Sequence, residues 1–226
     1  MGKLSIIVPV YNEVKTIKSV LDYLINLQFD KEIIVVNDGS TDGTSEILHA
    51  FKHPQVKILE HVANAGKGAA IINGIRAASG EVVAVQDADL EYKPDELIRL
   101  AEPIFKGEVD VVFGSRFLQK NPRKYLRFYI GNKIMSLMIS LIGWKHITDT
   151  YTCYKMFKRD IINSFTLSSR GFEIEAELSI LVARGKYRFK EMPISYNPRT
   201  IEEGKKINWK DAVKGILTVF KTRFKK

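Results

Sequence analysis

Short apolar runs alternate with stretches of helical periodicity along the first half of the chain, and this alternation limits the possible folds most. The apolar runs predict strands at 4–8, 33–36, 56–59, 82–85 and 109–113, with helices expected at 14–27, 41–51, 67–78 and 94–105. Strands that are apolar throughout, each followed by a helix, favour a parallel sheet covered on both faces. The predicted class is therefore α/β with a mostly parallel central sheet.

Three polar clusters follow strands of this sheet, at the point where each strand ends. They are Tyr11-Asn12-Glu13, residues 37–42 (NDGSTD) and residues 86–89 (QDAD). Ligands of such sheets bind beyond the carboxyl ends of the strands. A core needs none of these side chains, so we expect them to line a shared pocket.

Two aspartates separated by one residue, Asp87 and Asp89, follow the predicted strand 82–85. Carboxylates at this spacing repel each other unless a cation lies between them. Mg²⁺ and Mn²⁺ prefer oxygen ligands and often take one or two protein carboxylates together with substrate phosphates. The pair thus indicates a divalent metal that stabilises the charge on a departing diphosphate. A solvated loop with one acid capping the next helix is the alternative.

Two further segments allow a structural and a functional interpretation. Residues 37–42 are typical of a turn with a helix cap, and a carboxylate among them can also bind a nucleobase or ribose. Residues 64–68 (NAGKG) look like a phosphate loop but lack the P-loop spacing. Lys67, at a predicted helix start, can face a phosphate, or it can be a surface lysine in a flexible loop.

The two halves of the chain carry opposite charge. Residues 1–114 contain 11 basic and 17 acidic residues, a net charge of −6, whereas residues 115–226 contain 24 and 9, a net charge of +15. This asymmetry indicates two tasks on one chain. The basic half favours an anionic partner, namely a phosphate group, an anionic lipid surface or a nucleic acid.

Two amphipathic helices are expected in the basic half. The first, 125–144, has a basic start, and the second, 208–224, places five apolar residues on one face: Trp209, Val213, Ile216, Phe220 and Phe224. Such helices can lie in a membrane interface, where basic residues add attraction to anionic lipid. The alternative is that both pack on the protein core or on a partner subunit. A shorter helix at 173–183 and an edge strand at 192–196, which contains Pro193, complete this half.

Other features of the sequence exclude several classes of protein. No apolar stretch reaches the roughly 20 residues that a membrane-spanning helix needs, and residues 1–5 run into a strand rather than a signal peptide. The single cysteine, Cys153, excludes a disulfide framework and fits a reducing compartment.

The motifs, taken together and in order, resemble those of the family 2 glycosyltransferases. They are residues 9–13 (PVYNE), 37–42, 64–68, 87–90 (DADL), 113–116 (FGSR), 149–155 (DTYTCYK), 171–175 (GFEIE) and 196–199 (YNPR). The likeness covers essentially the whole chain. It is strongest to the branch of dolichyl-phosphate mannose synthases and polyprenyl-phosphate glucosyltransferases.

The resemblance implies a nucleotide-diphospho-sugar transferase fold of the A type and an inverting transfer that depends on Mg²⁺ or Mn²⁺. The nucleotide would be held by Pro9, Tyr11, Glu13, Asp38 and Asp42; the donor would be contacted by Lys67 and Asp87; the metal would be bound by Asp89, with Asp87 and Glu91 as further metal ligands; and Arg199 and Lys205 would close over the donor. Glu91 stands where some relatives have glutamine, and Asn37 stands where many have aspartate, so the donor sugar and base stay open.

A phosphate acceptor suits the basic half. A lipid monophosphate is anionic at neutral pH, so it needs placement and charge neutralisation rather than a general base. Arg116 is the leading candidate because its planar fork can bind two phosphate oxygens, with Arg127 second and Arg123 third. Asp149 is expected to orient an arginine or the sugar, and Glu173 is expected to be a charge at a helix N-terminus.

The leading hypothesis is a transferase that moves a hexose from GDP-mannose or UDP-glucose to a polyprenyl or dolichyl phosphate. Residues 1–114 would bind the donor and residues 115–226 the acceptor within one catalytic domain, associated peripherally with the cytoplasmic face of a membrane. A second hypothesis has a hydroxyl of a glycan or protein as acceptor, with Glu173 or Asp149 as base. The third, a basic nucleic-acid-binding module, lacks any recognised motif, so no nucleic acid is expected as a partner.

Overall fold

One seven-stranded sheet runs through both halves of the chain in the computed structural model, which describes residues 2–122, 124–200 and 209–224. The strands are β1 (Leu4–Val10), β2 (Lys31–Asn37), β3 (Val56–Glu60), β4 (Val82–Val85), β5 (Val111–Ser115), β6 (Lys155–Lys158) and β7 (Phe189–Pro193). Their order is β3-β2-β1-β4-β6-β5-β7, and all neighbours are parallel except β6, which is antiparallel to β4 and β5. The predicted α/β class is confirmed.

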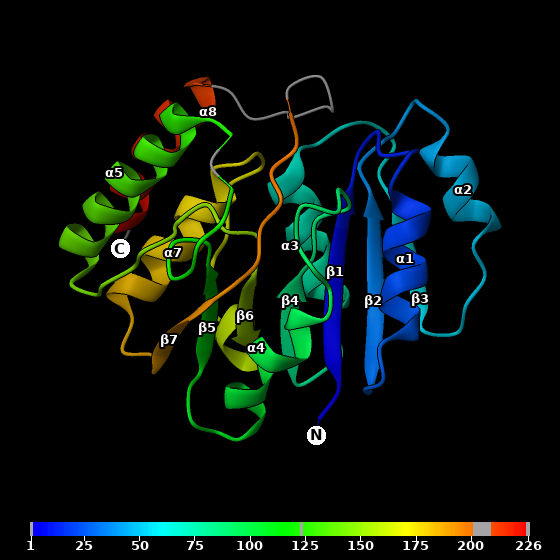
Figure 1. Cartoon of the computed structure of the whole chain (residues 1–226), viewed down its shortest axis with the longest axis horizontal. Coiled ribbons are helices and arrows are strands. Elements are labelled where there is room, and N and C mark those ends of the chain that lie inside the picture. Colours follow the sequence, from blue (N-terminus) through cyan, green and yellow to red (C-terminus); the bar gives the residue numbers. More distant parts are fainter. Residues whose placement is uncertain (1, 123, 201–208, 225–226) are drawn as a thin grey trace.

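The helices flank the sheet and form an additional group beside one end of it (Figure 1). They are α1 (Ile17–Asn26), α2 (Thr44–Ala50), α3 (Lys67–Ala77), α4 (Glu96–Phe105), α5 (Leu126–Gly143), α6 (Arg159–Asn163), α7 (Ile174–Arg184) and α8 (Trp209–Phe224). Helix α3 packs on β1 and β2, and α4 packs on β4 and β5. Helices α5, α7 and α8 pack on one another near β5 and β7.

Strand β6 and the short helix α6 that follows it were not predicted from the sequence. The strand lies between β4 and β5, so it separates the two strands that the alternating pattern would place side by side. Its first residue, Lys155, is fully buried, and a buried lysine hides the apolar pattern by which a central strand is predicted. The edge strand expected at 192–196 exists as β7 but begins and ends earlier, at Phe189–Pro193.

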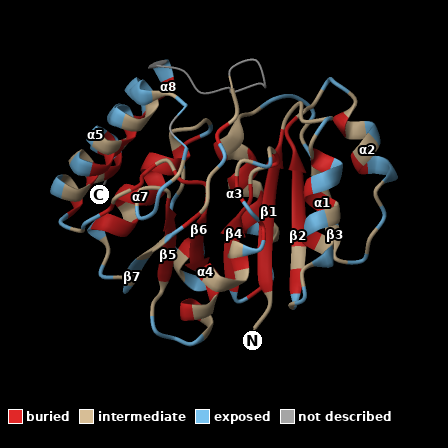
Figure 2. Ribbon diagram, in the orientation of Figure 1, coloured by how far each residue is buried: buried red, intermediate tan, exposed pale blue. Residues whose placement is uncertain are grey.

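Helices α5 and α8 bury several polar and small side chains and expose many apolar ones. The buried positions of α5 include Asn132, Ser136 and Gly143, and α8 buries Asp211, Gly215, Val219 and Thr222. A Cβ at Gly143 would lie 2.2 Å from Cβ of Ala183, so a glycine lets α5 approach α7 closely. Figure 2 shows the exposed residues along the outer sides of both helices.

The outward face of this helix pair is a large apolar surface. On α5 and its end it consists of Leu126, Ile130, Ile134, Leu137, Leu141 and Trp144, and on α8 of Val213, Ile216, Leu217, Phe220 and Phe224. Trp144 is 90% exposed. We call these eleven residues the apolar face. The alternative that these helices pack on the core holds for Met135, Ile139 and Val219, which are buried there, but not for the apolar face. Within the described residues, no helix is long and apolar enough to span a membrane.

Candidate active site

A single cavity of about 910 Å³ lies beyond the carboxyl ends of the strands and brings most of the predicted residues together. Those that line it are Pro9, Tyr11, Glu13, Asp38, Lys67, Asp87, Asp89, Glu91, Arg116, Arg127 and Arg199. They come from the end of β1, from segments that follow β1, β2, β4, β5 and β7, and from the starts of α3 and α5. Parallel strands place their carboxyl ends at one edge of the sheet, which is why residues so distant in sequence meet. Lys205 and Arg123 lie outside the described residues.

The acid pair after β4 is held by two basic side chains of the protein itself. Nζ of Lys67 lies 2.8 Å from Oδ1 of Asp87, and Nη2 of Arg199 lies 2.9 Å from Oδ2 of Asp89. Nη1 of Arg199 also lies 3.0 Å from Oε2 of Glu13. Burial would raise the pKa of Asp87, but Lys67 keeps it below its ordinary value. We call this end of the cavity the donor end, because the sequence predicts that the sugar donor binds there. Acidic and basic side chains alternate closely in it.

Asp89 carries more negative charge around it than its arginine partner offsets. Burial, together with the charges of Asp87 and Glu91, raises the pKa of Asp89 to about 7, against the opposing effect of Arg199. A divalent cation would relieve this repulsion. No group of three or more His, Cys, Asp or Glu side chains in the described chain forms a metal cage. Two carboxylates that leave the remaining positions to phosphate oxygens and water fit Mg²⁺ or Mn²⁺.

Glu91 has a structural task in addition to its predicted role as a metal ligand. Its Oε1 accepts the backbone N–H of Arg199 at 2.6 Å, and its Oε2 accepts the hydroxyl of Tyr196 at 2.9 Å. These bonds fasten the segment after β7 over the acid pair. Glu91 therefore positions the arginine that contacts Asp89, and its role as a metal ligand stays a prediction.

Asp38 is buried at the donor end, where several groups of the protein bind its carboxylate. Oδ1 lies 2.6 Å from Nδ1 of His61 and accepts the N–H of Ala65, and Oδ2 accepts the N–H of Gly66. These two N–H groups belong to residues 64–68, so they are not available to a phosphate, and the likeness to a phosphate loop is misleading. Gly66 has φ +99, and a Cβ there would lie 2.3 Å from the carbonyl oxygen of Arg170, so the glycine serves chain packing.

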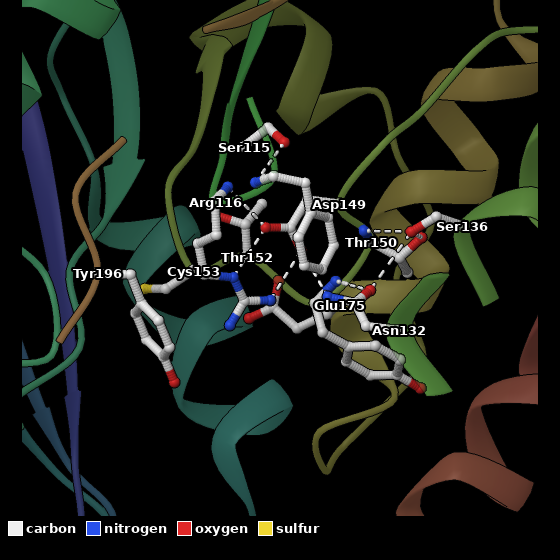
Figure 3. Close-up of polar contacts among 12 residues, drawn as sticks. Ser115, Arg116, Asn132, Ser136, Asp149, Thr150, Thr152, Cys153, Glu175 and Tyr196 are labelled. Carbon is white, nitrogen blue, oxygen red and sulfur yellow. Dashed lines mark hydrogen bonds and ion pairs between the residues drawn. The ribbon is translucent and has the colours of Figure 1, made fainter. Parts of the chain in front are cut away.

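Several side chains of the protein hold Arg116 in place (Figure 3). We call this part of the cavity the acceptor end, because Arg116 is the residue predicted to bind the acceptor phosphate. Its Nε and Nη2 donate to Oδ2 and Oδ1 of Asp149 at 2.8 and 2.7 Å, and Nδ2 of Asn132 donates to Oδ1 at 2.6 Å. Cζ of Arg116 also lies 4.9 Å from the centre of the Tyr196 ring. Asp149 thus contacts an arginine, one of the two roles expected for it. Since a guanidinium has five N–H donors, the pairing leaves three of them for a ligand.

The cavity continues from Arg116 toward α5 and α8 between aromatic and aliphatic side chains. This part is lined by Phe117, Tyr125, Phe128, Tyr129, Met135, Tyr151 and Ala212, together with the basic residues Lys124 and Arg127. The guanidinium of Arg127 stacks on the ring of Phe128, 4.9 Å from its centre. The cavity thus has a donor end lined by charged side chains and an acceptor end lined mostly by aromatic ones.

Two predicted residues have other positions. Asp42 is not among the residues that line the cavity, because its carboxylate accepts the N–H and hydroxyl of Thr44 and the N–H of Val14. It joins the start of α2 to the segment after β1. Glu173 stands at the N-cap of α7 and accepts the N–H of Gly171, as expected of a helix N-terminal charge.

Sequence reasoning missed four residues that shape this site. Tyr196 covers Arg116, His61 contacts Asp38, and the carboxylate of Glu175 pairs with Lys67 and with the buried Lys155. Glu175, Lys155 and Tyr196 all lie within motifs that carry the family resemblance. That membership was the available indication, but it does not show which side chains point inward.

A mostly parallel sheet with an acid pair beyond its central strand, opening into one substrate cavity, defines a nucleotide-diphospho-sugar transferase fold of the A type. The solved structure of glucosyl-3-phosphoglycerate synthase from Mycobacterium tuberculosis with Mn²⁺, UDP and phosphoglyceric acid has this fold. It superposes with a TM-score of 0.75 at 19% identity, over 99% of this chain and 79% of that one. The chain belongs to glycosyl transferase family 2, whose family model matches residues 5–165.

Curated relatives lie in one branch of this family. A dolichyl-phosphate β-glucosyltransferase of Trichomonas vaginalis is 33% identical, covering 84% of this chain and 63% of the relative. A dolichol-phosphate mannosyltransferase of Pyrococcus furiosus is 32% identical, covering 90% of this chain and 59% of the relative. The chain therefore spans about three fifths of the length of each of these relatives.

Proposed function

We propose that this protein transfers a hexose, with inversion, from a nucleotide-diphospho-sugar to a polyprenyl or dolichyl phosphate. One observation carries the proposal: a single cavity joins the acid pair and Lys67 at one end to Arg116 and an aromatic lining at the other. The first end suits a metal-bound diphosphate, and the second suits a phosphate attached to a hydrocarbon chain. The names of the two relatives, a glucosyltransferase and a mannosyltransferase of dolichyl phosphate, support a hexose as the transferred group and a lipid phosphate as the acceptor.

The state of Asp149 favours a phosphate acceptor over a hydroxyl acceptor. A hydroxyl needs a general base, and the sequence offers Asp149 or Glu173. Asp149 is fully buried and paired with Arg116 through two bonds, and although burial would raise its pKa, Arg116 holds it below the ordinary value. Glu173 is not among the residues that line the cavity. A lipid phosphate needs no base, because its second pKa is about 6.

The chain's own residues would act on both reactants. When bound at Asp87 and Asp89, Mg²⁺ or Mn²⁺ supplies charge stabilisation to the departing diphosphate. Lys67 and Arg199 lie close enough to the acid pair to bind the same diphosphate. Arg116, held by Asp149, would orient the acceptor phosphate so that one of its oxygens faces the sugar carbon opposite to the leaving group.

The apolar face is proposed to dock on an anionic lipid surface. The two helices also carry basic residues: Lys124 just before α5, Arg127 and Lys133 within it, and Lys210, Lys214, Lys221 and Arg223 in α8. Apolar burial together with basic residues near an anionic surface, worth roughly 1 kcal/mol each, favours interfacial binding. The cavity reaches both helices, so a lipid acceptor would enter from that side. We place the protein at the cytoplasmic leaflet because that leaflet is negatively charged.

The test is a donor screen with a short-chain polyprenyl phosphate and Mn²⁺. Radiolabelled GDP-mannose and UDP-glucose are supplied separately, and the organic phase is analysed for a labelled lipid. We expect one donor to give a lipid-linked product that Asp89→Asn abolishes. Label that appears on a glycan hydroxyl instead, or nucleotide binding without any lipid product, would refute the acceptor. Retention of RNA without nucleotide-sugar binding would favour the nucleic-acid module.

A further inference from the structure

Glu175 of α7 joins the donor end of the cavity to the protein interior. Its side chain is only 5% exposed, and its two oxygens bind two different lysines. Oε1 lies 3.1 Å from Nζ of Lys67, and Oε2 lies 2.5 Å from Nζ of Lys155. Figure 3 shows Glu175 beside the segment of Asp149 and Thr152. The carboxylate therefore touches both a cavity residue and a core residue.

Lys155 is already fully bound without any contact with a substrate. Its Nζ donates to the carbonyl oxygens of Thr150 and Thr152 at 2.8 and 2.6 Å, and Glu175 accepts the third bond. An ammonium group has three donors. The side chain of Lys155 is completely buried, so it holds Glu175 in one place, and burial lowers the pKa of Lys155 although Glu175 opposes this.

Lys67 is shared between two carboxylates. Its Nζ lies 2.8 Å from Asp87 and 3.1 Å from Glu175, and the side chain is 16% exposed to the cavity. Burial would lower the pKa of Lys67, but Asp87 and Glu175 together raise it well above its ordinary value. Two of its three donors are used, which leaves one for a donor phosphate.

Without Glu175, Lys67 would have Asp87 as its single carboxylate partner. A lysine paired with Asp87 alone competes with a metal for that oxygen, since both are attracted to the same charge. The second carboxylate offsets this attraction and keeps the ammonium at a fixed point between the two acids. Two lysines and two acids then form a neutral buried cluster, which favours its burial.

We propose that Glu175 is a positioning residue that shares the charge of Lys67 with Asp87, so that Lys67 can leave Asp87 to the metal and bind the donor diphosphate. The inference rests on the proposed function, because it assumes a metal-bound diphosphate at this end of the cavity. It predicts that Glu175 changes the metal requirement of nucleotide binding without touching the nucleotide or the acceptor.

The test measures binding of UDP and of GDP by calorimetry while Mn²⁺ is varied, without any acceptor. Glu175→Gln keeps the shape of the side chain and removes its charge. We expect the Mn²⁺ concentration that gives half-maximal nucleotide binding to rise about tenfold, as outer partners of metal sites typically affect affinity. Glu175→Asp keeps the charge on a shorter side chain, so it should raise this Mn²⁺ concentration less than Glu175→Gln does.

Two controls separate positioning from folding. Glu175→Gln leaves the buried Lys155 without its carboxylate, so the melting temperature should fall. Combining it with Lys155→Met removes the uncompensated charge and should recover the melting temperature but not the Mn²⁺ requirement. Lys155→Met alone leaves Glu175 charged and facing Lys67 but less firmly held, so it should raise the Mn²⁺ requirement less than Glu175→Gln does.

Each outcome has a distinct meaning. If the double variant regains the original Mn²⁺ requirement together with its stability, Glu175 only balances Lys155, and the inference is wrong. An unchanged Mn²⁺ requirement in Glu175→Gln also overturns it. If the unaltered protein binds neither UDP nor GDP at any Mn²⁺ concentration, the proposed function itself fails.

Discussion

Nη2 of Arg199 lies 2.9 Å from Oδ2 of Asp89, so the guanidinium of one residue covers the carboxylate that is predicted to bind the metal. Lys67 has the same relationship to Asp87. Basic side chains of the protein therefore contact both carboxylates of the predicted metal site. Binding of a metal and a diphosphate is then an exchange of partners, in which the metal takes the acids and the phosphates take the bases.

Arg199→Gln should have opposite effects on the metal and on the nucleotide. Without the competing guanidinium, Mn²⁺ alone should bind several-fold more tightly. Nucleotide diphosphate should bind roughly tenfold more weakly, since it loses a charge-assisted contact. Mn²⁺ binding is measured by electron paramagnetic resonance and nucleotide binding by calorimetry. Arg188→Gln is the control, because Arg188 pairs with Asp110 at an exposed position. Weaker Mn²⁺ binding in Arg199→Gln would contradict the exchange.

The pKa of Asp89 predicts a pH dependence for metal-supported nucleotide binding. Since burial and neighbouring acids raise that pKa to about 7, the carboxyl group is mostly protonated below this pH and must lose its proton to bind a metal. Binding should weaken by up to about tenfold per pH unit as the pH falls below 7. Calorimetry in buffers of different ionisation enthalpy measures the released proton. Affinity that is independent of pH would contradict the prediction.

The raised pKa of Asp89 also affects the stability of the metal-free protein, but there a lower pH is favourable. A carboxyl group whose pKa is raised on folding binds its proton more strongly in the folded state. Its contribution is therefore fully present below the ordinary pKa of about 4 and is lost as the pH rises through about 7. Asp89→Asn should therefore raise the melting temperature without metal more at pH 7 than at pH 4, and an equal effect at both pH values would contradict the prediction.

The pair of Arg116 and Asp149 should be important for stability as well as for the acceptor. Asp149 is fully buried and the side chain of Arg116 is 14% exposed, so Asp149→Asn leaves a charge without its partner. Loss of one member of a buried pair costs about 3–5 kcal/mol, which chemical denaturation can measure. Arg116→Lys keeps the charge but not the planar fork. It should raise the KM for the lipid phosphate while nucleotide binding stays unchanged. If the affinities for the lipid phosphate and for the nucleotide fell equally, a role at the acceptor end would be refuted.

The apolar face should decide membrane binding. Leu137→Glu and Phe220→Glu place charges on side chains that are 61% and 45% exposed, so both variants should fold normally yet lose flotation with anionic phospholipid vesicles. Val62→Glu is the matched control, because Val62 is fully exposed on the segment after β3. Binding of the unaltered protein should weaken at high salt. A change from dimer to monomer without lipid, with vesicle binding unaffected, would show that a partner subunit covers this face instead.

Local patterns in the sequence determined much of the fold and of the donor end. Each of the first five strands contains a run of apolar residues, and helices such as α1 bury Ile17, Val20, Leu21 and Leu24 at helical spacing. Polar clusters at the ends of such strands necessarily meet at one edge of a parallel sheet. The strand ends therefore predict that Asp87 and Asp89 lie near Tyr11 and Asp38, and all four line the cavity, whereas the contact of Lys67 with the donor is implied by the family resemblance.

Only the tertiary structure decided which charges are paired and which faces are covered. Lys155 begins β6, a buried strand that no apolar pattern in the sequence predicts. Its ion pair with Glu175 joins this strand to α7. The sequence also shows that α5 and α8 are amphipathic, but not that their apolar sides face outward. Periodicity records which residues share a face of a helix, whereas the partner of that face depends on contacts between segments distant in sequence, and these exist only once the chain has folded.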